Sequence, residues 1–192
     1  MEEERVKSAL EIAMERISGL PELTPEEIAE QKEKEYRPVG EALTNKYMQD
    51  VLDENGFMYE LNKHQGDSGA IVRRVFISSL CRAIQLEDFQ ATVKAMNGLC
   101  RLAGDAEGMR GKANAAWIGI LDRFEQGKNT TLEKYEASER EKLDALGISG
   151  SAVQPNLKEN ESLKKDLDGL RASLEPELGR LRAMFLQKLQ KD

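Results

Sequence analysis

The sequence predicts an all-α protein, a helical bundle followed by a long C-terminal helix that bears a coiled-coil-like leucine seam. Apolar residues recur at three- and four-residue steps along most of the chain, which places them on one face of a helix. Charged residues make up 33% of the sequence and aromatic residues only 5%, and strand-like alternation of β-branched residues is scarce. We expect a bundle over residues 1–146 with its core at 69–126, a connector over 147–156 and a C-terminal helical segment over 157–192.

Two helices are predicted before the core. The first covers about residues 3–18, with one apolar stripe formed by Val6, Leu10, Ala13 and Ile17. The second begins at Thr24, because Thr-Pro-Glu-Glu combines an N-cap residue, a proline at the first helical position and a glutamate three residues after the cap. Residues 30–35 are all polar or charged, so we expect these turns to be solvated on every side. Pro38 should kink or restart this helix, and the run Asp53-Glu54-Asn55-Gly56 should end it.

The central region is predicted to form the core. Residues 55–69 lack clean periodicity and are expected to form a loop. Broad apolar stripes then follow over 71–84, 89–103 and 113–124, with a break near residues 86–88 and a glycine-rich turn at 106–113. Beyond Gly127 the apolar pattern becomes sparse, on an otherwise charged helix that should end at Gly147.

The C-terminal segment carries a narrow apolar seam. Its members recur at three- and four-residue steps, as in a coiled coil, and are Leu163, Leu167, Leu170, Leu174, Leu178, Leu181 and Phe185, with Leu189 continuing the pattern. Pro176 should kink this helix or start a new one. The seam predicts a homo-oligomer or a protein partner, but it would serve equally well to fold the helix back onto its own bundle, and the sequence leaves both alternatives open.

The charge distribution limits the classes of partner. The formal net charge is -7, and residues 1–66 hold 16 acidic but only 8 basic residues. Binding to nucleic acids or to an anionic membrane usually needs a cationic surface, so neither is expected. The N-terminus MEEERVK does not resemble a secretory signal, and the longest apolar stretch, residues 115–121, is too short to cross a bilayer. A cytoplasmic location is therefore expected.

One stretch has the spacing of a phosphate-binding loop. Residues 106–112 match the pattern up to Lys112, but Ala113 stands where that loop needs a Ser or Thr, and no strand precedes it. The remaining anion-site candidates are Arg73, Arg74, Arg110 and Lys112, with Arg101 beside them in a predicted arginine-rich rim. Alternatively, these cations pair with the acids of residues 1–66 and hold the N-terminal helices against the core.

No other group of residues indicates catalysis, a metal or a cofactor. Cys81 and Cys100 lie at apolar-face positions, where a free cysteine acts as a small buried hydrophobe. His64 is the only histidine, and no histidine or cysteine cluster accompanies it. We expect no metal and no cofactor.

Two short pieces, residues 8–16 (SALEIAMER) and 147–156 (GISGSAVQPN), resemble segments of an uncharacterised family of small helical bacterial proteins. The resemblance implies a bacterial cytoplasmic protein of unknown function and transfers no active site. The residues themselves favour a non-catalytic interaction or assembly protein over an enzyme. The alternative is a small-ligand protein or enzyme that binds a phosphate-containing group at the arginine-rich rim.

Overall fold

The protein is all-helical. The computed structural model describes residues 8, 10, 24–104, 106–148, 150 and 155–189, and within these residues it contains six helices and no strand. Apart from Ser8 and Leu10, the predicted first helix lies outside the described residues, as does much of the predicted connector. No helix in the described ranges combines the length and the apolar character needed to cross a membrane. The helices are α2 (Pro25–Met48), α3 (Glu54–Lys63), α4 (Gly66–Arg82), α5 (Phe89–Leu102), α6 (Ala106–Ala145) and α7 (Glu161–Leu189).

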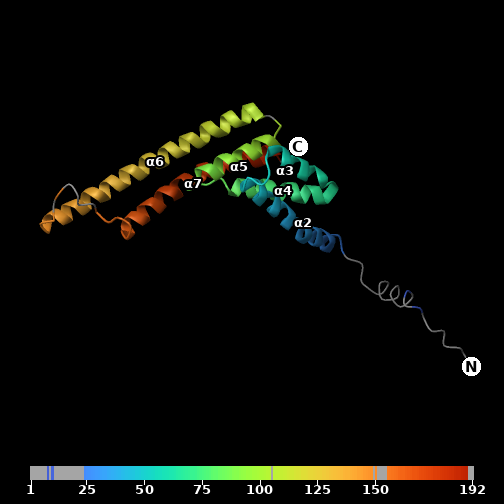
Figure 1. Ribbon diagram of the computed structural model, residues 1–192, viewed down its shortest axis with the longest axis horizontal. Coiled ribbons are helices and arrows are strands. Elements are labelled where there is room, and N and C mark those ends of the chain that lie inside the picture. The colour runs from blue at the N-terminus through green and yellow to red at the C-terminus, as the bar shows by residue number, and fades with distance from the viewer. Residues whose placement is uncertain are drawn as a thin grey trace, which may run out of the picture.

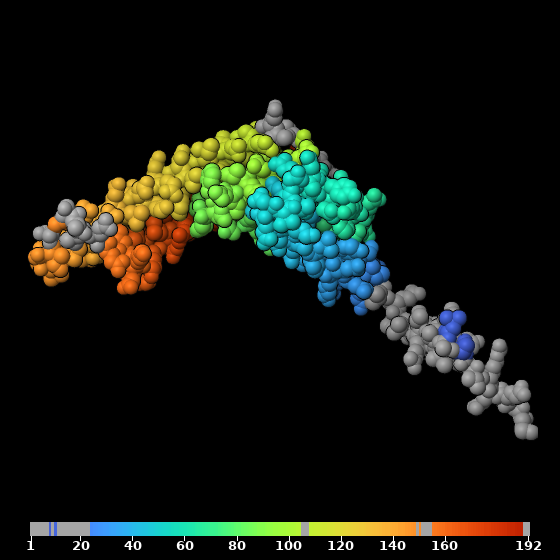
Figure 2. Space-filling view, in the orientation of Figure 1, coloured from blue at the N-terminus to red at the C-terminus, as the bar shows by residue number. Residues whose placement is uncertain are grey.

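The helices form a cluster and a long hairpin. Helices α2 to α5 gather at one end of the molecule, while α6 and α7 lie side by side and extend away from them (Figure 1). The space-filling view shows the hairpin as an arm that projects from the cluster (Figure 2). The second half of α7 packs against α4 and α5, so residues from α2 to α7 share one hydrophobic core. The division of the chain at the connector stays a prediction.

Helix α2 begins as predicted but ends earlier. The Thr24 hydroxyl accepts a hydrogen bond from the Glu27 amide at 3.2 Å, and the Glu27 carboxylate accepts one from the Thr24 amide at 2.8 Å. Pro38 lies inside the continuous helix, so of the two predicted effects, a kink or a restart, the restart does not occur. The helix ends at Met48 and the chain turns through Asp50, whose φ of 61° is left-handed. Asp53, which we expected to help end α2, begins the next helix instead.

The predicted loop at residues 55–69 is wrong, because most of it is helical. The Asp53 side chain accepts a hydrogen bond from the Gly56 amide at 2.6 Å and caps α3. Phe57 and Leu61, one turn apart, are both buried. Since Phe57 stacks edge-on against Tyr47 with 4.9 Å between ring centroids, tertiary packing stabilises a helix that the turn-forming residues of this segment disfavour.

Helix α6 also differs from the prediction. It is one continuous helix of 40 residues, where we expected a glycine-rich turn at 106–113. The turn lies just before it, where Gly104 has a φ of 68°. Ala113 and Trp117 are buried in the core, and this packing compensates for the poor helix propensity of the glycines in the first turns.

The leucine seam is covered by the chain's own helices. Leu163, Leu174, Leu178, Leu181, Phe185 and Leu189 are buried, and Leu167 and Leu170 are partly buried. Helix α7 is continuous through Pro176, so no new helix starts there. Helix α7 packs against α6 along its length and against α4 and α5 near its end. The structure thus agrees with the alternative in which the C-terminal helix folds back onto its own bundle.

Candidate functional site

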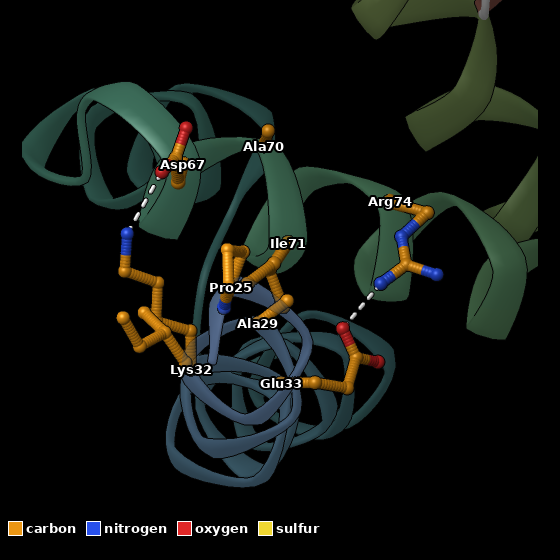
Figure 3. A pocket seen from close by; sticks show the side chains of 9 residues that line it. Pro25, Ala29, Lys32, Glu33, Asp67, Ala70, Ile71 and Arg74 are labelled. Atoms are coloured by element: carbon orange, nitrogen blue, oxygen red, sulfur yellow. Dashed lines mark hydrogen bonds and ion pairs between the residues drawn. The ribbon is translucent and has the colours of Figure 1, made fainter. Parts of the chain in front are cut away.

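An open groove of about 530 Å³ lies between the first half of α2 and the first half of α4. Its floor is apolar and its rim is charged, and its lining residues are Pro25, Ile28, Ala29, Lys32 and Glu33 from α2 and Asp67, Ala70, Ile71 and Arg74 from α4. Figure 3 shows the apolar side chains between two ion pairs, one on each side of the groove. Ile28 is 42% exposed, so this large aliphatic side chain adds open apolar surface to the groove.

The four rim charges neutralise one another in two pairs. Lys32 contacts Asp67 at 2.8 Å, and Arg74 pairs with Glu33, which also binds Arg37 on its own helix at 3.1 Å. The hydrogen bond with Asp67 raises the pKa of Lys32, and the same bond lowers the pKa of Asp67. Both groups therefore stay charged around neutral pH, and the groove carries no unbalanced charge on its rim.

Helices α2 and α4 pack against each other, and they come especially close at Gly40, beyond the groove. At Gly40 the helices are so close that an added Cβ would lie 2.8 Å from the Val75 Cβ and 2.9 Å from the Val72 carbonyl oxygen. Toward the start of each helix the residues that line the groove include the small Ala29 and Ala70, which are too short to fill it. The close approach at Gly40 thus lies next to a region where small side chains leave the groove open.

The predicted anion-site residues on α4 have different surroundings. Arg74 is exposed and is held by Glu33 of α2, so this arginine does what the alternative interpretation expected, pairing with an acid of the N-terminal region. Arg73 is partly buried next to it in the sequence. An anion that approached Arg74 would have to displace the Glu33 carboxylate.

The candidates on α6 lie elsewhere. Arg110 is close enough to Cys100 and to Tyr47 to oppose the rise in their pKa values, and Lys112 is exposed. Arg74 pairs with Glu33, and Arg110 lies near Tyr47 of the same helix. Since Glu33 and Tyr47 are separated by about 21 Å along α2, at 1.5 Å per residue, the two arginines are far apart. In the described part of the chain α4 and α6 do not pack on each other. The structure thus separates the predicted rim into two pairs, and anion binding by either pair stays a prediction.

The cysteines and the histidine do not form a reactive group. Cys81 and Cys100 are free and buried, as predicted, and burial raises the pKa of the Cys81 thiol to about 11. Such thiols are weak nucleophiles near neutral pH. His64 ends α3 and its ring lies edge-on to Tyr36, with 6.4 Å between centroids. Among the residues that the structure describes, no group of three or more His, Cys, Asp or Glu side chains is placed to hold a metal ion.

A second, shallower groove of about 410 Å³ borders the turn between α2 and α3 and the start of α5. Its polar groups already have structural partners: the Tyr47 hydroxyl donates to the Lys94 carbonyl oxygen at 3.0 Å, the Lys94 ammonium pairs with Asp50, and Asp53 caps α3. Because these groups hold α2, α3 and α5 together, this groove is a weaker candidate for ligand binding than the one between α2 and α4.

The amino-acid sequence alone does not predict the α2–α4 groove. The turns at residues 30–35 were expected to be solvated on every side, yet Lys32 and Glu33 are partly buried and reach across to α4. The available signal was the pair Ile28 and Ala29 at the start of α2, an apolar pair outside the main stripe of that helix. Their partners Ala70 and Ile71 come 42 residues later, and no local pattern connects the two pairs.

The chain matches no protein-family model, and no curated protein or solved structure matches it significantly. The resemblance of residues 8–16 and 147–156 to a bacterial family therefore stays a prediction, and the site has to be interpreted from its own geometry.

Proposed function

We propose that this chain is a non-catalytic interaction protein that binds one amphipathic helix of a partner protein in the groove between α2 and α4. The observation that carries the proposal is the groove itself, whose apolar floor is open and whose four rim charges already neutralise one another. A helix that inserts an apolar stripe can cover this floor without breaking either ion pair, which is the usual way a groove recognises a helix.

The floor residues suit a helix in size. Ala29 and Ala70 are small and exposed, so a helix backbone can approach closely above them. Ile28 and Ile71 supply apolar surface on either side. Each large aliphatic side chain that the complex buries contributes on the order of 1.5–3 kcal/mol before the loss of freedom on binding is subtracted.

The charge of α2 indicates which helix would bind best. Residues 25–35 hold five glutamates, at positions 26, 27, 30, 33 and 35, but only two lysines, at 32 and 34. A partner helix with basic residues at the edges of its apolar stripe would be attracted to this acidic surface, and like charges would disfavour an acidic one. We therefore assign the groove to a basic-edged amphipathic helix.

This proposal replaces the leucine seam as the partner surface, because the seam side chains are covered by the chain's own helices. A cytoplasmic setting, which the sequence favours, is part of the proposal. The alternative function, binding of a phosphate-containing ligand at an arginine-rich rim, gains no support from arginines that lie in separate places and, at Arg74, already bind a carboxylate.

The test is a titration of the full chain with a fluorescein-labelled synthetic helix that has leucines at alternating four- and three-residue steps and lysines along both edges. We expect an increase in anisotropy with a Kd in the micromolar range, about 1–100 μM. Ala29→Glu and Ala70→Glu place a charge on the floor and should weaken binding by about tenfold or more. Ala137→Glu, the same change at an exposed position of α6, is the matched control and should leave the Kd unchanged.

Two results would contradict the proposal. One is no binding of the labelled helix to any form of the protein. The other is binding that the two groove substitutions and the Ala137→Glu control affect equally, because the helix would then bind elsewhere.

A further inference from the structure

The groove between α2 and α4 is short. The residues of α4 that line it run from Asp67 to Arg74, which is about 10.5 Å of helix at 1.5 Å per residue. Those of α2 run from Pro25 to Glu33, which is about 12 Å. Since one helical turn advances by about 5.4 Å, the groove is about two turns long, whether a bound helix follows α2 or α4.

Charged side chains limit the apolar floor of the groove. Lys32 pairs with Asp67 at 2.8 Å, and Glu33 pairs with Arg74. Figure 3 shows these pairs on opposite sides of the apolar side chains. An apolar side chain placed over an ion pair would remove the charges from water and offer no hydrogen bond in exchange, which opposes binding. The two pairs therefore confine apolar contacts to the floor between them.

Unfilled space lies in the middle of this floor. Ala70 comes midway between the two charged lining residues of α4, and Ala29 is the small lining residue of α2. Both alanines are exposed, so the backbone of a bound helix can approach them closely. A large side chain in the middle of its apolar stripe would then enter the space that the short alanine side chains leave, beside Ile28 and Ile71. A small side chain there would leave this space without contacts.

We propose that the groove recognises a short helical segment of a partner protein, about two turns long, with three apolar anchors at positions i, i+4 and i+7 and a large side chain at the middle one. This inference rests on the proposed function and deepens it, since it specifies the helix that the same groove binds. Anchors at these positions span seven residues, which is the same length of helix as from Asp67 to Arg74.

A longer amphipathic helix has no advantage at this groove. Its additional anchors would extend past the apolar floor, over the charged rim or into solvent, and would not be removed from water. Affinity should therefore depend on three side chains, each of which lowers the Kd by about fivefold to tenfold once the loss of its freedom is subtracted.

The first test varies the number of anchors. The probes are fluorescein-labelled synthetic helices of equal length with the same lysines along both edges, in which one to five consecutive stripe positions are leucine and the others alanine. Alanine and leucine are both good helix formers, so helix content stays similar along the series. With the full chain, we expect the second and third leucines to lower the Kd by about fivefold to tenfold each. The fourth and fifth together should lower it by at most about threefold, because they only add registers of the same three contacts. Fourth and fifth leucines that lower the Kd as much as the second and third would overturn the proposal.

The second test exchanges large and small side chains across the contact. Ala29→Leu or Ala70→Leu fills the space that the middle anchor is proposed to occupy. We expect either variant to bind the three-leucine helix about tenfold more weakly than the unaltered chain does. Each variant should instead prefer the helix whose middle leucine is replaced by alanine, and this recovery would show that the variant is folded. Ala137→Leu, at an exposed position of α6, is the matched control and should keep the preference of the unaltered chain. Binding of the three-leucine helix to both groove variants as tightly as to the unaltered chain would overturn the assignment of the middle anchor.

The two tests separate this inference from the proposed function. If none of the synthetic helices binds the unaltered chain, the proposed function fails and this inference fails with it. If the helices bind and Ala29→Glu and Ala70→Glu weaken them, but all five leucines contribute equally and Ala29→Leu and Ala70→Leu leave the preference unchanged, the groove binds helices without selecting a short one. In that case the proposed function stands and this inference is wrong.

Discussion

The hydroxyl of Thr92 binds the backbone of Gln85 twice. It accepts a hydrogen bond from the Gln85 amide at 2.9 Å and donates one to the Gln85 carbonyl oxygen at 2.8 Å. Thr92 is fully buried in α5, so this contact fixes the α4–α5 connection against the core. Thr92→Val has the same shape but leaves two backbone groups without their partner. We expect it to lower the free energy of unfolding by about 1–3 kcal/mol in urea denaturation. Thr130→Val, at an exposed position of α6, is the control and should change it by less than about 0.5 kcal/mol.

Gly40 permits the close contact between α2 and α4. An alanine there would place its Cβ 2.8 Å from the Val75 Cβ and 2.9 Å from a backbone oxygen, neither of which can move without shifting a helix. We expect Gly40→Ala to destabilise the protein by about 1–3 kcal/mol, although alanine is the better helix former. Gly169→Ala, in α7 with no atom within 4 Å of the added Cβ, should instead stabilise it by up to about 1 kcal/mol. Equal changes in melting temperature for the two variants would show that the α2–α4 contact is looser than described.

Stability should fall at alkaline pH because of Cys81. Burial raises the pKa of its thiol to about 11, compared with about 8.5 in an unfolded chain. The unfolded state therefore loses this proton at lower pH than the folded state. The contribution to stability is complete below about pH 8.5 and is lost as the pH rises toward 11. Urea midpoints measured between pH 8 and pH 10.5 should decline less steeply for Cys81→Ala than for the unaltered chain, and parallel declines would contradict the assignment.

The hairpin should open more readily far from the cluster than near it. From residue 125 to residue 145 no described side chain of α6 is fully buried, and on α7 only Leu163 is buried before Leu174. Regions with few buried contacts open locally at low cost. Hydrogen exchange followed by mass spectrometry should show faster exchange in residues 130–145 than in residues 72–80 of α4. Equal protection of both regions would mean that the whole hairpin unfolds only together with the core.

Periodicity predicted the core helices well because they are stabilised by the apolar stripes that produce the pattern. Val72, Phe76 and Leu80 of α4 and Met96 and Cys100 of α5 are all buried where the spacing indicates. The break between these two helices also occurs where expected, since α4 ends at Arg82 and α5 begins at Phe89.

The errors fall where tertiary packing outweighs local preference. Residues 54–63 contain turn-forming residues, and a helix there depends on Phe57 reaching Tyr47 from another part of the chain. In α6 the glycine-rich turn expected at 106–113 is absent, and the helix also continues through Gly127. Leu170 of α7 packs directly against this glycine, and an added Cβ would lie 2.8 Å from its Cδ1 atom. A glycine selected for a close helix contact looks, in the sequence alone, like a glycine selected for a turn.

The candidate site was the least predictable part. Its individual residues are ordinary, and it forms only where α2 packs against α4, which comes later in the sequence. Of the four predicted anion-site residues, only Arg74 lines the groove, and there it binds Glu33.

The sparse packing of the hairpin also affects how this protein can change in length. Between Phe124, the last buried residue of α6, and Ala145 the arm extends about 30 Å, at 1.5 Å per residue, without contributing to the core. Matched insertions or deletions of seven residues in α6 and α7 would lengthen or shorten it in steps of about 10 Å and keep the same faces in contact. The exposed Leu146 and Ile148 at its tip could thus be set at different distances from the groove while the cluster of α2 to α5 stays unchanged. The arm is therefore the part of the molecule whose dimensions natural variation can adjust most freely.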